Sequence, residues 1–203
     1  TEVIMSKIIT IGREFGSGGH VAGQLIADKL GIPYYDNELI SMAIKHGGIT
    51  HGRPLDKFDE KKFNPFLFES NYYGNENAPK GEPMEEVLFK LQRDVIIDIA
   101  NNGPAIIIGR CADWILKEEK FNVLSVFISA PLEQRIDRIM AKYDVEESKA
   151  ISLIKKHDKR RKAYYKFHTM KEWGNPKSYD YYFNTEDLSL EQIVDEVVML
   201  YNE

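Results

Sequence analysis

The stretch SKIITIGREFGSGGHVAGQLIADKLGIPYYD, residues 6–36, predicts a strand, a glycine-rich loop, a helix and a second strand in succession. The apolar run 8–11 is typical of a buried strand, and apolar residues at helical spacing follow the loop. Glycine lets the backbone approach a ligand closely, and the first turn of a helix presents unpaired N–H groups to an anion. We therefore expect phosphate to bind at five consecutive residues, Gly16, Ser17, Gly18, Gly19 and His20.

The loop departs from the Walker A pattern G-x-x-x-x-G-K-[ST] at the position of the lysine. Alignment on the following helix places Gly19 at the lysine, and His20 and Val21 at the small residue and the hydroxyl. Ser17 is the only hydroxyl of the loop, and Arg13 is its only fixed positive charge. Two interpretations follow: a degenerate Walker A motif that binds phosphate, or a tight strand-to-helix turn without a ligand.

Composition limits the class of protein. The 203 residues are 43% hydrophobic and 29% charged, which is ordinary for a globular chain that can bury a sizeable core. A formal net charge of −5 argues against nucleic acid as the partner. The single cysteine, Cys111, excludes an internal disulfide and has no neighbours at metal-ligand spacing, so we expect no metal held by protein ligands alone. Without a secretory signal or a membrane-spanning run in the sequence, we expect a cytoplasmic protein.

Strands and helices alternate along the chain, which predicts a parallel sheet with helices on both faces. We expect one domain, 1–203, with a three-layer α/β/α fold of the P-loop NTPase type and a five-stranded parallel sheet. The expected strands are 8–11, 32–35, 105–108, 123–129 and 181–184. The expected helices are 21–30, 37–45, 83–100, 112–117, 132–142, 145–168 and a last one ending at 200.

Two helix starts carry capping patterns, Asp144 with Glu147 and Ser189 with Gln192. The segment 46–81 differs from the rest, because it is rich in glycine, asparagine and aromatic residues and shows no sustained periodicity. It is either a folded insertion or a loop that covers the core.

Several motifs, taken together, resemble the cytidylate kinase-like family of P-loop proteins and, more distantly, the bacterial cytidylate kinases. The resemblance runs almost end to end, through GREFGSGG (12–19), YYDNELI (34–40), IIGRCAD (107–113), the segment 158–165, YD (179–180) and NT (184–185). It implies a nucleoside monophosphate kinase architecture that uses ATP and Mg²⁺. The insertion 46–81 would cover the acceptor nucleotide, and the region 145–168 would be the lid.

The resemblance also assigns residues to the acceptor. Cytidylate kinases bind it with an arginine after the third strand and with an aspartate and an arginine three apart in the lid. Arg110, Asp158 and Arg161 match those positions, and Arg160 joins Arg161 in the lid. Asp36, at the end of the second strand, either binds the acceptor, holds Mg²⁺ through water, or caps the next helix.

Phosphoryl transfer depends on positive charge around the transferred group, which arginine supplies well. We expect Arg13, Arg110 and Arg161 to act in catalysis. The alternatives are an ion pair of Arg110 with an acid such as Asp36, and an ordinary exposed face for the basic run 155–162. Arg135 and Arg138 are either further charge suppliers or an exposed face of their helix.

Three functions are compatible with these patterns. The first is transfer of the ATP γ-phosphate to a nucleoside monophosphate such as CMP or dCMP. The second is a non-catalytic nucleotide or phosphate binder, a sensor or interaction protein that lacks the Walker lysine. The third is a kinase of another small acceptor.

Overall fold

The computed structural model describes residues 7–36, 39, 42 and 84–203, and within them lies a sheet of five parallel strands. The strands are β1 (Ile8–Arg13), β2 (Tyr34–Tyr35), β3 (Ile106–Ile108), β4 (Val123–Ser129) and β5 (Tyr181–Asn184). Their order is β2-β3-β1-β4-β5, so β1 lies at the centre of the sheet. The predicted five-stranded parallel sheet is confirmed, although β2 is shorter than expected.

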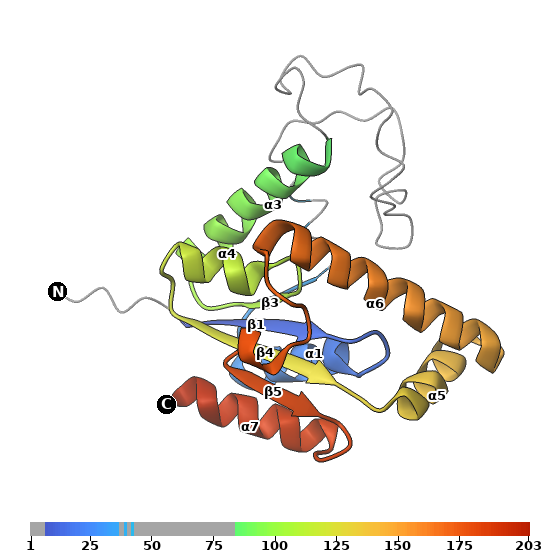
Figure 1. Cartoon of the computed structure of the whole chain (residues 1–203). Helices are drawn as coiled ribbons and strands as arrows, with labels where there is room; N and C mark the ends of the chain where they lie inside the picture. Colours follow the sequence, from blue (N-terminus) through green and yellow to red (C-terminus); the bar gives the residue numbers. More distant parts are fainter. Residues whose placement is uncertain (1–6, 37–38, 40–41, 43–83) are drawn as a thin grey trace.

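Helices cover both faces of this sheet (Figure 1). The helices are α1 (Gly19–Leu30), α3 (Met84–Asn101), α4 (Ala112–Glu118), α5 (Leu132–Tyr143), α6 (Glu147–Thr169) and α7 (Leu190–Asn202), with the 3-10 helix η2 (Pro176–Ser178). Because side chains alternate along a strand, β1 serves two cores. Ile9 and Ile11 are buried with residues of α1 and α7, whereas Ile8 is buried with residues of α3 and α4. The three-layer α/β/α architecture is therefore confirmed.

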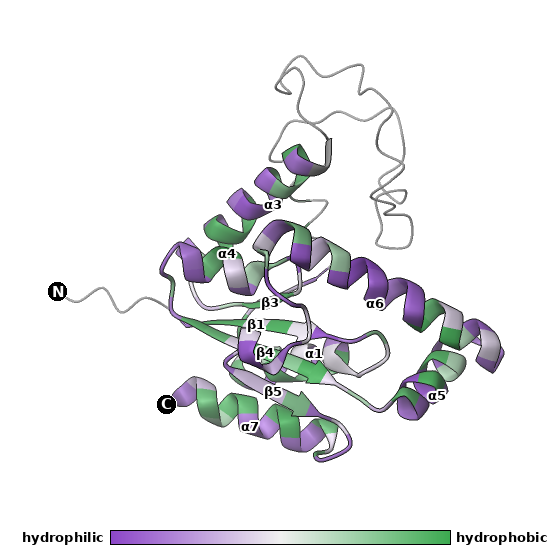
Figure 2. Ribbon diagram, viewed as in Figure 1, coloured by the Kyte–Doolittle hydropathy of each residue, from purple (hydrophilic) through white to green (hydrophobic). Residues whose placement is uncertain are grey.

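Helices α5 and α6 pack on each other through a third cluster that contains Ile136, Ile139, Ala150 and Ile154. Phe15, from the loop after β1, packs against the same cluster. Figure 2 shows that much of α6 is hydrophilic, which agrees with its charged sequence. The α5–α6 pair is thus joined to the glycine loop by an apolar contact as well as by the polar contacts described below.

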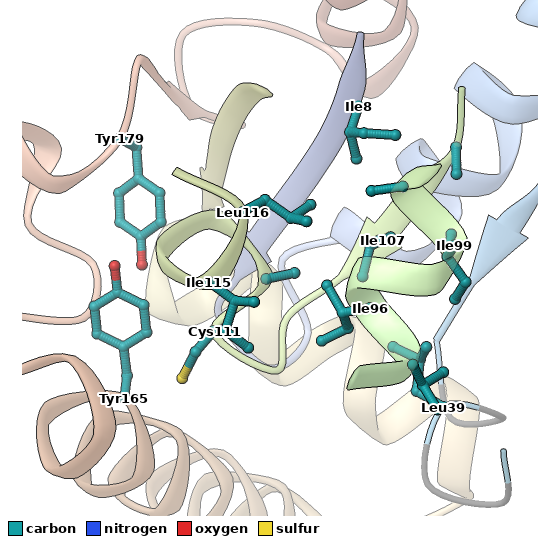
Figure 3. Close-up of a cluster of buried hydrophobic side chains, with 14 of the residues drawn as sticks. Ile8, Leu39, Ile96, Ile99, Ile107, Cys111, Ile115, Leu116, Tyr165 and Tyr179 are labelled. Atoms are coloured by element: carbon teal, nitrogen blue, oxygen red, sulfur yellow. The ribbon is translucent and has the colours of Figure 1, made fainter. Parts of the chain in front are cut away.

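A buried polar contact anchors the end of α6 on α4. The hydroxyl of Tyr165 donates a hydrogen bond to Oδ2 of Asp113 at 2.6 Å. Burial raises the pKa of the Asp113 carboxyl, and it also raises the pKa of the Tyr165 hydroxyl. Figure 3 shows the hydroxyls of Tyr165 and Tyr179 directed toward each other near Cys111. This contact joins the C-terminal half of α6 to α4.

One predicted helix cap is wrong and the other is confirmed. Asp144 does not start α6; it ends α5 in the left-handed conformation, at φ 51°, and Glu146 precedes α6 without a side-chain cap. The chain must reverse between these two helices, and aspartate tolerates the left-handed conformation that such a reversal needs. Ser189 and Gln192 form the predicted capping box, with side-chain-to-backbone distances of 3.2 and 2.9 Å.

Two predictions concern residues that the structure mostly does not describe. The expected helix 37–45 lies outside the described residues except for Leu39 and Met42, which are both helical. The segment 46–81 lies wholly outside them. Among the described helices, none is both long enough and apolar enough to cross a membrane.

Candidate active site

The loop between β1 and α1 has a backbone shape that requires glycine. Gly16 and Gly18 have φ values of 85° and 89°, in the left-handed region. A β-carbon on Gly18 would lie 2.8 Å from Leu190, and one on Gly16 would lie 3.0 Å from the carbonyl of Arg135. Ser17 is fully buried between them, and its Oγ accepts a hydrogen bond from the Gly19 N–H at 3.4 Å. The loop therefore leads into α1 through a tight backbone conformation that side chains at residues 16 and 18 would disturb.

A cluster of polar side chains lies beside this loop, at the carboxyl ends of β1 and β2. Asp36, which is 5% exposed, accepts a hydrogen bond from Nη2 of Arg13 at 3.3 Å. Its second oxygen lies 2.8 Å from Nδ1 of His20, and the Tyr34 hydroxyl lies 2.7 Å from the same nitrogen. The structure thus brings together Arg13, His20 and Asp36, which the sequence analysis selected separately.

Helix α6 lies next to the loop (Figure 1) and contacts it through polar side chains. The carboxylate of Asp158 accepts a hydrogen bond from the Phe15 N–H at 2.9 Å. Arg161 donates through Nη1 to the carbonyl oxygen of Arg13 at 3.0 Å. His157 stacks on the Phe15 ring, with centroids 4.1 Å apart. The basic run is therefore not an ordinary exposed face, although its four lysines (Lys155, Lys156, Lys159, Lys162) are exposed.

Arg135 of α5 connects the loop to α6. Its Nε donates to the Phe15 carbonyl at 2.9 Å, its Nη1 lies 3.2 Å from a Glu14 carboxylate oxygen, and its Nη2 pairs with Asp158. Arg135 is 6% exposed, so the interpretation of an exposed helix face is wrong for this residue. Burial raises the pKa of Glu14, which a hydrogen bond from Ala130 N–H and the charge of Arg135 oppose.

Arg138, one turn further along α5, is only partly buried and also contacts the loop. It donates to the carbonyl of Gly16 at 3.2 Å and to Oε1 of Gln134 at 3.1 Å. Burial lowers the pKa of its guanidinium. Both arginines of this helix therefore bind backbone carbonyls of the loop, those of Phe15 and Gly16.

A strained turn follows β3 and positions Arg110. Gly109, Arg110 and Cys111 have φ values of 70°, 57° and 56°, three left-handed residues in a row. Such conformations are unfavourable for side chains other than glycine and cluster at functional sites. Burial raises the pKa of the Cys111 thiol well above its usual value, so Cys111 is a poor nucleophile. Arg110 lies at the same carboxyl edge as Arg13.

The residues present fit a nucleotide phosphate better than a metal bound by protein alone. Left-handed glycines before a helix N-terminus are the arrangement in which backbone N–H groups bind phosphate. Within the described residues, no three His, Cys, Asp or Glu side chains are grouped to hold a metal ion. Mg²⁺ bound with a nucleotide needs only one or two carboxylates besides the phosphates, and Asp36 is a carboxylate at this edge.

A parallel sheet in the order β2-β3-β1-β4-β5, with a glycine loop after its central strand, defines a P-loop kinase-like fold. The sequence model of the Cytidylate kinase-like family matches residues 8–187. The chain belongs to this family, and the resemblance seen in its motifs is confirmed.

The chain is also similar to three solved structures and to one protein sequence. An uncharacterized protein from Eubacterium ventriosum superposes with a TM-score of 0.73 at 26% identity, covering 98% of this chain and 99% of that one. A shikimate kinase from Bacteroides thetaiotaomicron gives a TM-score of 0.53 at 17% identity, covering 97% and 98%. The Mycobacterium tuberculosis APS kinase CysC, in complex with AMPPNP and APS, gives 0.52 at 17% identity, covering 98% and 99%.

The sequence relative is a uronate isomerase from Corynebacterium glutamicum that is 30% identical over 111 residues. The match covers 54% of this chain and 20% of that protein, so it concerns a small part of a longer relative. The two kinases share less than a fifth of their residues with this chain and show its fold alone.

Sequence reasoning missed Glu14, Tyr34 and His157, which contact Arg135, His20 and Phe15 respectively. Glu14 carried a usable signal, because an acid inside an anion-binding loop is unfavourable unless a cation neutralises it. Tyr34 and His157 carried none, since their contacts to His20 and Phe15 arise only when distant elements pack together. Arg160 lies on α6, is half-buried, and keeps its lid role as a prediction.

Proposed function

We propose that this chain is a phosphotransferase that moves the γ-phosphate of ATP to a nucleoside monophosphate, with CMP or dCMP as the first candidates. One observation carries the proposal. A glycine loop shaped for phosphate runs into the N-terminus of α1, at the sheet edge where Arg13 ends β1 and Arg110 follows β3. Membership of the Cytidylate kinase-like family supports the choice of acceptor.

The proposal gives each part of the site a task. The N–H groups from Gly16 to His20 hold the donor phosphates, which the positive end of α1 stabilises. Arg13, Arg110 and Arg161 offset the negative charge of the transferred group. Bound ATP would supply the transferred phosphoryl group, and Mg²⁺ bound with ATP would offset part of the negative charge on the phosphates.

The acceptor lies between β2, β3 and α6 in this proposal. Asp36, Arg110 and Arg161 bind it, while Arg160 and Arg161 of α6 cover it as the lid. Asp158 binds the acceptor only after it releases the Phe15 N–H and Arg135. The family resemblance assigns the covering of the acceptor to the segment 46–81, and the proposal keeps that assignment. We place the reaction in the cytoplasm, where ATP is available and Cys111 stays reduced.

A second candidate function is phosphoryl transfer to a small hydroxyl-bearing acceptor. A phosphate acceptor is already ionised at neutral pH, whereas an alcohol must lose a proton to a general base. His20 has a 48% exposed ring whose Nδ1 lies 2.8 Å from buried Asp36, the arrangement by which an acid orients a histidine base. This dyad is the observation that favours the second candidate.

The test is ADP release from ATP and Mg²⁺ with a panel of nucleoside monophosphates and small alcohols, together with calorimetry of the same ligands. The proposal predicts turnover with CMP or dCMP. It also predicts that Arg110→Ala lowers kcat by about 100-fold with the unfolding midpoint unchanged. Arg93→Ala, at an exposed residue of α3, is the matched control and should keep full turnover.

Other outcomes separate the alternatives. Turnover with an alcohol and with no nucleoside monophosphate would replace the first candidate by the second. Binding of nucleotide without any turnover would favour a non-catalytic sensor. A folded Arg110→Ala variant with unchanged kcat would remove Arg110 from the proposed catalytic set.

A further inference from the structure

The position that the Walker motif gives to lysine is sterically closed in this protein. A β-carbon added at Gly19 would lie 2.5 Å from Cβ and 3.1 Å from Cγ of Arg13. These atoms are the base of the Arg13 side chain, so they cannot swing away as the end of a flexible side chain would. A lysine at residue 19 and any side chain at residue 13 therefore compete for the same space.

The guanidinium of Arg13 lies further along the same edge of the sheet. A β-carbon added at Gly109 would overlap its Nη1, so this glycine leaves the space that the guanidinium occupies after β3. Nη2 bonds to Asp36 after β2 at 3.3 Å, and the side chain of Arg13 is 9% exposed. Two glycines thus accommodate the arginine, one at its stem and one at its head, and Asp36 fixes its orientation.

We infer that Arg13 replaces the missing P-loop lysine, entering the phosphate site from β1 instead of from α1. The inference rests on the proposed function and adds to it the cation that contacts the terminal phosphates of a nucleoside di- or triphosphate. The guanidinium is permanently charged and its planar fork matches phosphate oxygens. Because packing and Asp36 already hold the side chain, little conformational entropy is lost when phosphate binds.

The position of Arg13 explains both why residue 19 is not lysine and why it is glycine. Gly19 is required because Arg13 lies over it, and Arg13 is required because no side chain at residue 19 can reach the phosphates. Gly19 does not have a positive φ, so the backbone at this residue can carry a lysine once the Arg13 side chain is removed. Moving the charge from residue 13 to residue 19 should therefore be possible when both are changed together.

The test is calorimetric binding of ADP and of inorganic tripolyphosphate, with Mg²⁺, to wild type and five variants. Arg13→Gln keeps most of the stem and removes the charge, and it should weaken binding of both ligands about tenfold or more. Gly19→Lys alone should lower the unfolding midpoint because of the overlap with Arg13. Arg13→Gly should bind weakly, and Arg13→Gly/Gly19→Lys should bind more tightly than Arg13→Gly. Arg93→Gln on α3 loses the same charge far from the loop and should bind as wild type does.

Two results would overturn the inference: Arg13→Gln that binds like Arg93→Gln, or a folded double variant that binds no better than Arg13→Gly. If the double variant does not fold, the Arg13→Gln comparison still decides. Wild-type protein that binds neither ligand would instead refute the proposed function itself, so the two failures are distinguishable.

Discussion

Arg135→Ala should destabilise the fold strongly, because this arginine neutralises two acids at once. It pairs with Glu14 of the loop and Asp158 of α6, and it donates to the Phe15 carbonyl at 2.9 Å. Truncation to alanine leaves both carboxylates without their guanidinium and the carbonyl without this donor.

The magnitude follows from burial. Removal of one partner from a fully buried ion pair costs about 3 to 5 kcal/mol. The carboxylate side chains of Glu14 and Asp158 are 25% and 19% exposed, so water recovers part of that cost. We expect a loss of about 2 to 4 kcal/mol in the free energy of unfolding at pH 7.

The same variant has a pH signature. Burial already raises the pKa of Glu14, and the loss of the Arg135 charge should raise it further. An acid whose pKa is higher in the folded state than in the unfolded state destabilises the fold at pH values above its folded pKa and ceases to do so once protonated. The stability difference between Arg135→Ala and wild type should therefore shrink as the pH falls toward 4.

Urea unfolding at pH 7 and pH 4.5 measures both effects. Lys159→Ala is the matched control, since it removes an exposed cation of α6 next to Asp158 and should change stability by less than about 0.5 kcal/mol. A loss for Arg135→Ala no larger than that of the control would refute the view that Arg135 joins the loop to α6.

Three further substitutions test two other parts of the fold. Burial lowers the pKa of His168 from 6.5 to about 4, where the ring stacks on Phe89 of α3 with centroids 3.8 Å apart. A histidine held neutral stabilises the fold above its unfolded pKa and loses that contribution as the pH falls, so wild type should lose about 1 kcal/mol between pH 7 and pH 5 that His168→Gln does not lose. Urea midpoints at the two pH values measure this, and an equal slope in both proteins would contradict it. Gly18→Ala, at φ 89° and with its new β-carbon 2.8 Å from Leu190, should cost about 2 to 4 kcal/mol and abolish ADP binding. Gly31→Ala, at φ 64° but in open space, should cost about 1 kcal/mol and bind normally; equal costs in thermal melts would show that contact with Leu190 is unimportant.

The sheet and its glycine loop could be predicted because their signals are local. Apolar runs locate β4 and β5 at the residues predicted, 123–129 and 181–184. Glycine spacing located the loop, since few residues other than glycine adopt the φ values of Gly16 and Gly18.

The contacts that hold the site together could not be predicted in the same way. Arg135 and Arg138 share a helix face, but their spacing does not say whether that face meets solvent or the loop. The pairing of Asp36 with Arg13, in place of the Arg110 pair considered from the sequence, depends on which strands are neighbours at the carboxyl edge. The overlap between Arg13 and a β-carbon added at residue 19 arises only when the loop is folded. A substitute for the lysine could therefore not be identified from the sequence.

The most direct test of the central claim is hydrogen exchange of the wild-type backbone amides with and without MgATP. The account predicts slower exchange at Gly16 to His20, because their N–H groups would then donate to phosphate oxygens. Unchanged exchange in this loop, with ATP bound and protection found elsewhere, would contradict the account and place the nucleotide at another site.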